Sequence, residues 1–304
     1  MRIVVALGGN ALLERGERPE AGIQQHHVRQ AAEALAPLTA THEVVLCHGN
    51  GPQVGLLAVQ SGADPDLAHP YPLDTLGAQT QGMIGYWLAQ ALRGAGARRP
   101  VAALVTQTVV DPDDGAFAHP TKFIGPVYDE AQAARMAARH GWTVAPDGPG
   151  GQAWRRVVPS PRPVRIVELE QVAHLLRGGA AVICAGGGGI PVVEDGNGRL
   201  CGVDAVVDKD LTAALLAQRL DADRLVVLTD VPAVMSEFGT PRAAPIARLR
   251  VADLDESRFP AGSMGPKIAA CRQFVGATGR PAVVGALGQA AAVLAGTAGT
   301  AIVP

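Results

Sequence analysis

The sequence predicts an α/β fold in which a mostly parallel sheet is covered by helices on both faces. Short runs of Val, Ile, Leu and Ala recur along the chain and are almost continuously apolar, as in strands buried on both faces. Helix-like segments lie between these runs, and this alternation is typical of a parallel sheet. Of the 304 residues, 48% are hydrophobic and only 4% aromatic, which favours helices packed on strands over an all-β sandwich.

The expected strands and helices follow from these runs in order. The strands are expected at 2–7, 43–47, 101–105, 180–184, 224–229, 281–285 and 299–303. The principal helices are expected at 28–40, 73–93, 169–176, 209–220, 268–275 and 290–294. The helix at 169–176 stops at Gly178-Gly179, a favourable C-terminal cap, and Asp208 directly precedes the next one.

One segment, 111–163, breaks the alternation because it is rich in proline and glycine. It holds one expected helix, 129–140, and one short expected strand, 154–158. A segment of this length is too long for an ordinary loop, so we interpret it as a small subdomain inserted beside the edge of the sheet. A disordered linker is the alternative, and the aromatic residues Phe123, Trp142 and Trp154 favour the folded interpretation.

Composition excludes several classes of function. The net charge of −2 provides no basic excess for a general nucleic-acid binder. The four cysteines are far apart and form no C-x-x-C pair, which argues against a disulfide framework or zinc site and for a reducing compartment. The N-terminal apolar run is too short for a signal peptide, and no run approaches the ~20 residues of a membrane span. We therefore expect a cytoplasmic protein without a membrane or nucleic-acid partner.

Two of the expected strands run directly into glycine-asparagine turns. The first ends in Gly8-Gly9-Asn10, and the second in His48-Gly49-Asn50-Gly51. Such turns expose backbone N–H groups that suit an anion, although each is also explained as a tight connection between a strand and a helix. His48 is either a catalytic base or, as is more common for a lone histidine at a strand end, a hydrogen-bonding scaffold residue.

The third glycine cluster, Gly186 to Gly189, follows the strand at 180–184. Consecutive glycines permit a very close backbone approach, either to a phosphate-bearing ligand or to another backbone, and the sequence leaves both open. Asp208-Lys209-Asp210 opens a helix, where both aspartates suit the positive helix end but the lysine does not. A lysine held between two carboxylates has a fixed ammonium position, which is useful against phosphate oxygens.

Two more lysines lie in glycine- and proline-containing segments. Lys267 follows Gly262-Ser263-Met264-Gly265-Pro266 at a helix start, where a lysine is unfavourable unless an anion binds there. Lys122 lies in the inserted segment, either as a solvated surface residue or in an ordered loop. Neither a Walker A motif nor a Rossmann G-x-G-x-x-G after the first strand is present, which argues against a P-loop or nicotinamide enzyme.

Taken together, these motifs resemble the carbamate kinases of the amino-acid kinase family, and the resemblance runs nearly end to end. The matching segments are 5–12, 48–55, 81–86, 120–122, 156–161, 186–191, 208–210 and 262–267. Most relatives that phosphorylate acids carry a lysine where this chain has Ala6. The resemblance implies that Lys209 compensates.

The resemblance implies a three-layer αβα sandwich, the amino-acid kinase fold, as a single domain over 1–304 with 111–163 as an inserted lid. It implies an acceptor-binding lobe at about 1–200 and a nucleotide-binding lobe at about 201–304. The implied reaction is reversible phosphoryl transfer between ATP and carbamate, giving ADP and carbamoyl phosphate, in arginine or nitrogen catabolism. Mg²⁺ is expected to arrive with the nucleotide, with no metal site made by the protein, and a homodimer is expected.

The resemblance also assigns roles to residues. Lys209, Lys267, Lys122 and Asp210 are the expected catalytic residues, with Asp210 orienting the lysines. The expected acceptor-binding residues are Gly8, Gly9, Asn10, Asn50 and Gly51. The expected nucleotide-binding residues are Thr229, Asp230, Val231, Met264 and Gly265. A kinase of another small acid, or a nucleotide-binding protein without catalysis, are the alternatives.

Overall fold

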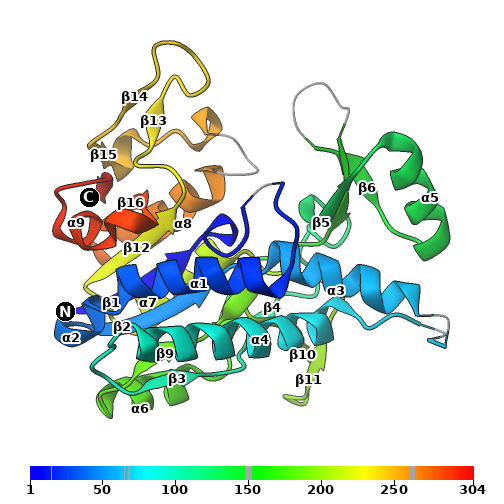
Figure 1. Cartoon of the computed structure of the whole chain (residues 1–304), viewed down its shortest axis with the longest axis horizontal. Helices are drawn as coiled ribbons and strands as arrows, with labels where there is room; N and C mark the ends of the chain where they lie inside the picture. The colour runs from blue at the N-terminus through cyan, green and yellow to red at the C-terminus, as the bar shows by residue number, and fades with distance from the viewer. Residues whose placement is uncertain (15, 65, 68, 148–152, 260–263) are drawn as a thin grey trace.

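The structure is a computed structural model (Figure 1) that describes residues 1–304 except 15, 65, 68, 148–152 and 260–263. For Asn10 and Ser257 it describes the backbone alone. Among the described residues, no helix combines the length and the apolar character that crossing a membrane requires.

The largest element of the fold is an eight-stranded sheet in the order β15-β17-β16-β12-β1-β2-β9-β3. All neighbouring strands in it are parallel except β16 and β17. Its seven strands predicted from sequence are confirmed, and the short edge strand β15 was not predicted. The bounds are β1 Arg2–Leu7, β2 Glu43–His48, β3 Val101–Ala103, β9 Ala181–Ile183, β12 Arg224–Thr229, β15 Arg248–Arg250, β16 Ala282–Ala286 and β17 Thr300–Val303.

Helices cover both faces of this sheet. Successive strand residues point to opposite sides, and because nearly all of them are apolar, both faces must be covered. Ile3 and Val5 share one core with α1, α4 and α9, whereas Val4 and Ala6 share another with α6, α7 and α8. The predicted α/β fold with three layers is therefore confirmed. The helices are α1 Ala21–Leu35, α4 Leu73–Gly94, α6 Leu169–Arg177, α7 Lys209–Arg219, α8 Met264–Thr278 and α9 Ala290–Ala295.

Two helix boundaries differ from the sequence prediction. Helix α1 begins and ends earlier than the predicted 28–40, and the short α2 (Leu38–Thr41) follows it after a break. Pro37 lies in that break, and proline is tolerated at a helix start but not in its interior. Helix α8 is longer than the predicted 268–275 at both ends.

A second sheet, not predicted, has the order β11-β10-β4-β8, and its edge strand β11 lies below α4 in Figure 1. Its strands are β4 Gln107–Val110, β8 Pro163–Ile166, β10 Ile190–Glu194 and β11 Leu200–Gly202. Strands β4 and β8 flank the inserted segment and pair antiparallel, so the two ends of that segment lie side by side.

The inserted segment itself forms a three-stranded antiparallel sheet in the order β5-β7-β6 with one helix. In Figure 1 it stands at the upper right, apart from the C-terminal strands and helices. Helix α5 begins with a capping box between Asp129 and Gln132 and ends at Gly141 in the left-handed conformation. The bounds are β5 Lys122–Tyr128, α5 Glu130–His140, β6 Val144–Pro146 and β7 Trp154–Val158.

The remaining elements are short, apart from α3, which starts directly after the second glycine-asparagine turn. They are α3 Gly51–Ala63, the hairpin strands β13 Met235–Ser236 and β14 Ala244–Pro245, and the 3₁₀ turns η1 Gly9–Ala11, η2 Gly186–Gly188, η3 Val251–Asp253, η4 Glu256–Arg258 and η5 Leu287–Gln289.

Candidate active site

The two glycine-asparagine turns meet at the carboxyl ends of the central strands β1 and β2. A Cβ atom on Gly49 would lie 2.9 Å from the Gly9 nitrogen and 3.5 Å from the Lys209 Cε. The Gly8 N–H donates to the Leu228 carbonyl at 2.9 Å, which joins the first turn to the end of β12. The structure therefore brings both turns and Lys209 into direct contact, and glycine at 49 is required because a side chain would collide with the neighbouring backbone.

Two of the predicted lysines converge on one carboxylate. Lys209 Nζ lies 2.5 Å from Asp210 Oδ1, and Lys267 Nζ lies 3.1 Å from Asp210 Oδ2. The side chains of Lys209 and Lys267 are only 11% and 13% exposed. Helices α7 and α8 pack side by side, so the first turn of each contributes one ammonium group to the same point.

The charges in this cluster perturb one another strongly. Burial alone would raise the pKa of Asp210, but the Lys209 and Lys267 ammonium groups outweigh it and hold that pKa well below its usual range. Burial lowers the pKa of Lys209, the Asp210 carboxylate opposes this, and Lys267 adds to it. For Lys267 burial also lowers the pKa, but the carboxylate of Asp210 prevails and the net direction is upward. Two cations around one anion leave an excess positive charge that suits phosphate oxygens.

The third lysine reaches this region from the inserted segment. Lys122, at the start of β5, places its Nζ 2.5 Å from Asp208 Oδ2. The other Asp208 oxygen accepts from the Asp210 N–H at 2.9 Å and so caps α7. This differs from the expected arrangement, in which Lys209 lies between both aspartates: Lys209 pairs with Asp210, and Asp208 holds Lys122.

These three residues are the only lysines in the sequence, since every other basic residue of the Lys and Arg pair is an arginine. The structure therefore gathers every lysine of the chain around Asp208 and Asp210. With Asp208 and Asp210 ionised, three positive charges face two negative ones.

His48 is held as a neutral scaffold residue. It is buried, and its Nδ1 lies 2.9 Å from the Gly49 carbonyl oxygen. Burial lowers the pKa of His48 to about 4, and the nearby Lys209 adds to the effect. The Nδ1 atom must donate to a carbonyl, which can only accept. The geometry therefore favours the scaffold interpretation over a catalytic base.

The four-glycine run is explained by close packing. A Cβ atom on Gly186 would lie 2.3 Å from His48 Nε2, and one on Gly187 would lie 2.2 Å from Asn50 Nδ2. Equivalent atoms on Gly188 and Gly189 would collide with the Val207 carbonyl and the Thr108 hydroxyl. Three of the four also have positive φ. The run thus packs against the second turn mainly through side chains, and only Gly188 makes the close approach to another backbone that was one of the two alternatives from the sequence.

The predicted acceptor-binding residues occupy the two turns. Asn50 precedes α3 as its N-cap residue, Gly51 is the first residue of that helix, and Asn50 Nδ2 donates to the Thr80 hydroxyl at 2.9 Å. Gly8 and Gly9 lie on the first turn, and the Asn10 side chain is outside the described part of the structure. Thr80 was not singled out from the sequence, because nothing in its helical surroundings marks it.

The predicted nucleotide-binding residues lie in two segments, the end of β12 and the start of α8. Thr229 ends β12, with Asp230 and Val231 directly after it, and the Thr229 hydroxyl donates to Asp230 Oδ1 at 2.9 Å. Met264 and Gly265 begin α8, three and two residues before Lys267, whereas Gly262 and Ser263 lie outside the described residues. The roles of these residues, like those of the lysines and turns, stay predictions.

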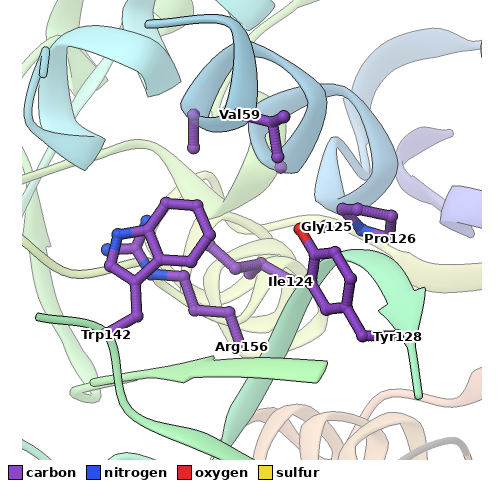
Figure 2. Close-up of a pocket in the computed structure, with 9 residues that line it drawn as sticks. Val59, Ile124, Gly125, Pro126, Tyr128, Trp142 and Arg156 are labelled. Atoms are coloured by element: carbon purple, nitrogen blue, oxygen red, sulfur yellow. The ribbon is translucent and has the colours of Figure 1, made fainter. Parts of the chain in front are cut away.

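The inserted segment contacts α3 through two glycines. A Cβ atom on Gly55 would lie only 2.0 Å from the Gly125 Cα, so the two backbones touch. Beside this contact is a small pocket, and Figure 2 shows the Trp142 and Arg156 side chains next to each other in it. The Arg156 guanidinium lies over the Trp142 ring, 4.5 Å from its centroid. These contacts fix the position of β5, which carries Lys122.

Comparisons with known proteins identify the family of the chain. A model of the amino acid kinase family matches residues 1–286. The chain is 51% identical to a carbamate kinase of Rhizobium meliloti over 99% of this chain and 93% of that one. It is 49% identical to a carbamate kinase of Haemophilus influenzae over 99% and 96% of the two chains.

Solved structures give the same result. The carbamate kinase of Giardia lamblia bound to citric acid superposes with a TM-score of 0.91 at 39% identity, covering 99% of this chain and 98% of that one. The same enzyme bound to AMP-PNP gives a TM-score of 0.88 at 39% identity and the same coverage. Sequence and fold agree, and the chain belongs to the amino acid kinase family.

Proposed function

We propose that the chain is a carbamate kinase, which transfers a phosphoryl group reversibly between ATP and carbamate to give ADP and carbamoyl phosphate. The observation that carries this proposal is the convergence of Lys209 and Lys267 on Asp210, beside two glycine turns that meet at Gly9 and Gly49. The near full-length similarity to carbamate kinases supports the choice of carbamate as the acceptor.

The chemistry of the acceptor explains why a neutral His48 is compatible with catalysis. A carbamate oxygen is already anionic, so it attacks the γ-phosphorus without losing a proton to a general base. The reaction then requires alignment of the two substrates and neutralisation of the charge on the transferring group. Ammonium groups and backbone N–H groups supply both.

Each group of residues has a distinct part in this mechanism. The N–H groups of Gly9 and Gly51, with Asn10 and Asn50, hold the carbamate and the transferring phosphoryl group, while Gly8, whose N–H donates to the Leu228 carbonyl, shapes the first turn. Lys209 and Lys267 bind the oxygens of the donor phosphate and stabilise the transition state, while Asp210 fixes their separation. Lys122 approaches from the inserted segment, which acts as a lid that excludes water.

The nucleotide is proposed to lie along the start of α8 and the end of β12, against Met264, Gly265, Thr229, Asp230 and Val231. Magnesium enters as part of the nucleotide substrate, because Mg²⁺ takes its ligands readily from phosphate and water oxygens. Both carboxylates of the lysine cluster, Asp208 and Asp210, are already paired with lysines.

A coupled assay of ATP formation from carbamoyl phosphate and MgADP tests the proposal. We expect turnover that is specific for carbamoyl phosphate among small acyl phosphates. ATP formation from a different acyl phosphate alone would indicate a kinase of another small acid. Binding of MgADP by calorimetry without turnover of any acyl phosphate would overturn the proposal in favour of a nucleotide-binding protein.

The direction of the reaction and the oligomeric state of the enzyme extend this proposal. We propose that the enzyme works in the ATP-forming direction, in arginine or other nitrogen catabolism in the cytoplasm, and as a homodimer. Net ATP formation at cellular concentrations of carbamoyl phosphate, and the mass in solution by light scattering, test the direction and the oligomer.

A further inference from the structure

The Asn50 side chain is oriented by a chain of hydrogen bonds that ends in helix α4. Its Nδ2 lies 2.9 Å from the Thr80 hydroxyl oxygen, and that hydroxyl lies 2.7 Å from the Gly77 carbonyl oxygen one helical turn earlier. Thr80 is fully buried, with 0% exposure. Water therefore does not compete for either of these bonds.

The direction of both bonds follows from the chemistry of the groups. A carbonyl oxygen only accepts, so the single Thr80 hydroxyl proton is directed to Gly77. The Thr80 oxygen then has only lone pairs left for Asn50, so the amide must present its NH₂ group to it. The orientation of the Asn50 amide is thus set by the fold, which removes the usual ambiguity between the nitrogen and oxygen of an amide.

This orientation leaves the Asn50 Oδ1 as an acceptor without a hydrogen-bond partner among the described residues, and Asn50 as a whole is 8% exposed. Gly187 closes the amide from another side, since a Cβ atom there would lie 2.2 to 2.5 Å from Nδ2, Cγ and Oδ1. The amide is therefore confined between Thr80 and the Gly187 backbone. The turn offers one fixed carbonyl-type oxygen among N–H groups.

We infer that Thr80 is a positioning residue for acceptor specificity, which turns the Asn50 Oδ1 toward the amino group of carbamate. This rests on the proposed function and on the placement of the acceptor at the Asn50 turn. The backbone N–H groups of the turns recognise carboxylate oxygens, which carbamate and acetate share. Only the carbamate NH₂ group can donate to Oδ1, whereas the methyl group of acetate would leave it unpaired.

The test compares carbamoyl phosphate with acetyl phosphate, which differ only in NH₂ against CH₃. The measured quantity is the ratio of kcat/KM for the two compounds with MgADP, in the wild type, Thr80→Val and Thr80→Ser. We expect the ratio to fall about tenfold in Thr80→Val, the effect of one lost hydrogen bond in a buried site. In Thr80→Ser, which keeps the hydroxyl, it should stay within about threefold of the wild type.

Thermal unfolding followed by circular dichroism separates this effect from a loss of structure. An equal fall of kcat/KM for both acyl phosphates in a folded Thr80→Val protein would overturn the inference but leave the proposed function intact. A wild-type ratio within about threefold of one, which needs no variant, would overturn the inference and also the expected specificity for carbamoyl phosphate. ATP formation from neither compound by the wild type would overturn the proposed function and this inference together.

Discussion

At the scale of single residues, two neighbouring aspartates organise the site. Asp210 separates Lys209 from Lys267, and Asp208 caps α7 with one oxygen while holding Lys122 with the other. The sequence singled out Lys209 and Lys267 from their unusual position at helix starts, whereas the expected roles of Lys122 and Asp210 came from the family resemblance. It could not predict the pairing of Lys122 with Asp208, because these residues lie 86 positions apart and no local pattern links them.

Removal of either lysine of the Asp210 pair should abolish most catalysis. We expect Lys209→Ala and Lys267→Ala each to lower the rate of ATP formation at least about 100-fold, because each removes a charge that stabilises the transferring phosphoryl group. Stopped assays with carbamoyl phosphate and MgADP measure this. Arg177→Ala, which removes an exposed cation on α6, is the matched control and should change nothing. A rate within about threefold of wild type, under ~1 kcal/mol, would contradict the assigned role.

His48 should make the protein less stable as the pH falls. Burial holds the pKa of His48 at about 4 in the folded protein, against an ordinary value of 6.5 for histidine. The unfolded chain therefore takes up a proton first, and the stability contribution present above pH 6.5 is lost as the pH falls toward 4. Between pH 7 and 5 this loss should be about 2 kcal/mol.

Urea unfolding of the wild type and His48→Gln at several pH values tests this expectation. The variant should have lower stability at pH 7 and a flatter dependence on pH above 5. His174→Gln, at an exposed position on α6, is the control. Parallel curves for the wild type and His48→Gln would show that His48 does not carry the effect.

At the scale of secondary structure, the sequence predicted the strands whose apolar character is strongest. The central strands are buried on both faces, so nearly all their residues are apolar and the signal is clear. The second sheet was missed because β8 and β11 are three or four residues long and partly exposed. Its strands find partners far away in the sequence, and local periodicity carries no information about such pairing.

The contact between α3 and β5 should be sensitive to a single methyl group. Gly55→Ala would place a Cβ 2.0 Å from the Gly125 Cα, so the two elements must separate. We expect a loss of about 1–3 kcal/mol in the free energy of unfolding, as for other overpacked cores, and a lower kcat because β5 carries Lys122. Gly82→Ala, at an exposed helical glycine in α4 with no atom within 4 Å, is the matched control.

The control should instead stabilise the protein by about 0.5–1 kcal/mol, since alanine favours a helix over glycine. Chemical unfolding and steady-state kinetics of both variants provide the measurements. If Gly55→Ala behaved like Gly82→Ala, the two backbones would not be in the close contact that the structure shows.

At the scale of the whole molecule, the site is assembled from parts that belong to different packing units. Lys209 and Lys267 begin helices that cover one face of the main sheet, whereas Lys122 belongs to the inserted segment. The Lys122 side chain is 39% exposed, about three times as much as the other two lysines. The cluster therefore combines two buried cations with one that is more exposed, on an element outside the main sheet.

Lys122→Ala should separate phosphoryl transfer from nucleotide binding. We expect kcat with carbamoyl phosphate to fall at least about tenfold, because a charge near the transferring group is lost. The Kd for MgADP, measured by calorimetry, should change by less than about threefold, since the proposed nucleotide site lies on the α8 side. Equal effects on both quantities would refute a role of the inserted segment as a lid over the acceptor.

The confinement of all lysines to one cluster has a practical consequence for spectroscopy. A protein grown with isotope-labelled lysine would carry three labelled side chains, and all three lie at the proposed site. Every labelled side-chain signal in its NMR spectrum would then report on an ammonium group of the proposed phosphate-binding cluster. Titration with MgADP or carbamoyl phosphate would show, without any engineered probe, which ammonium group each substrate engages and in what order.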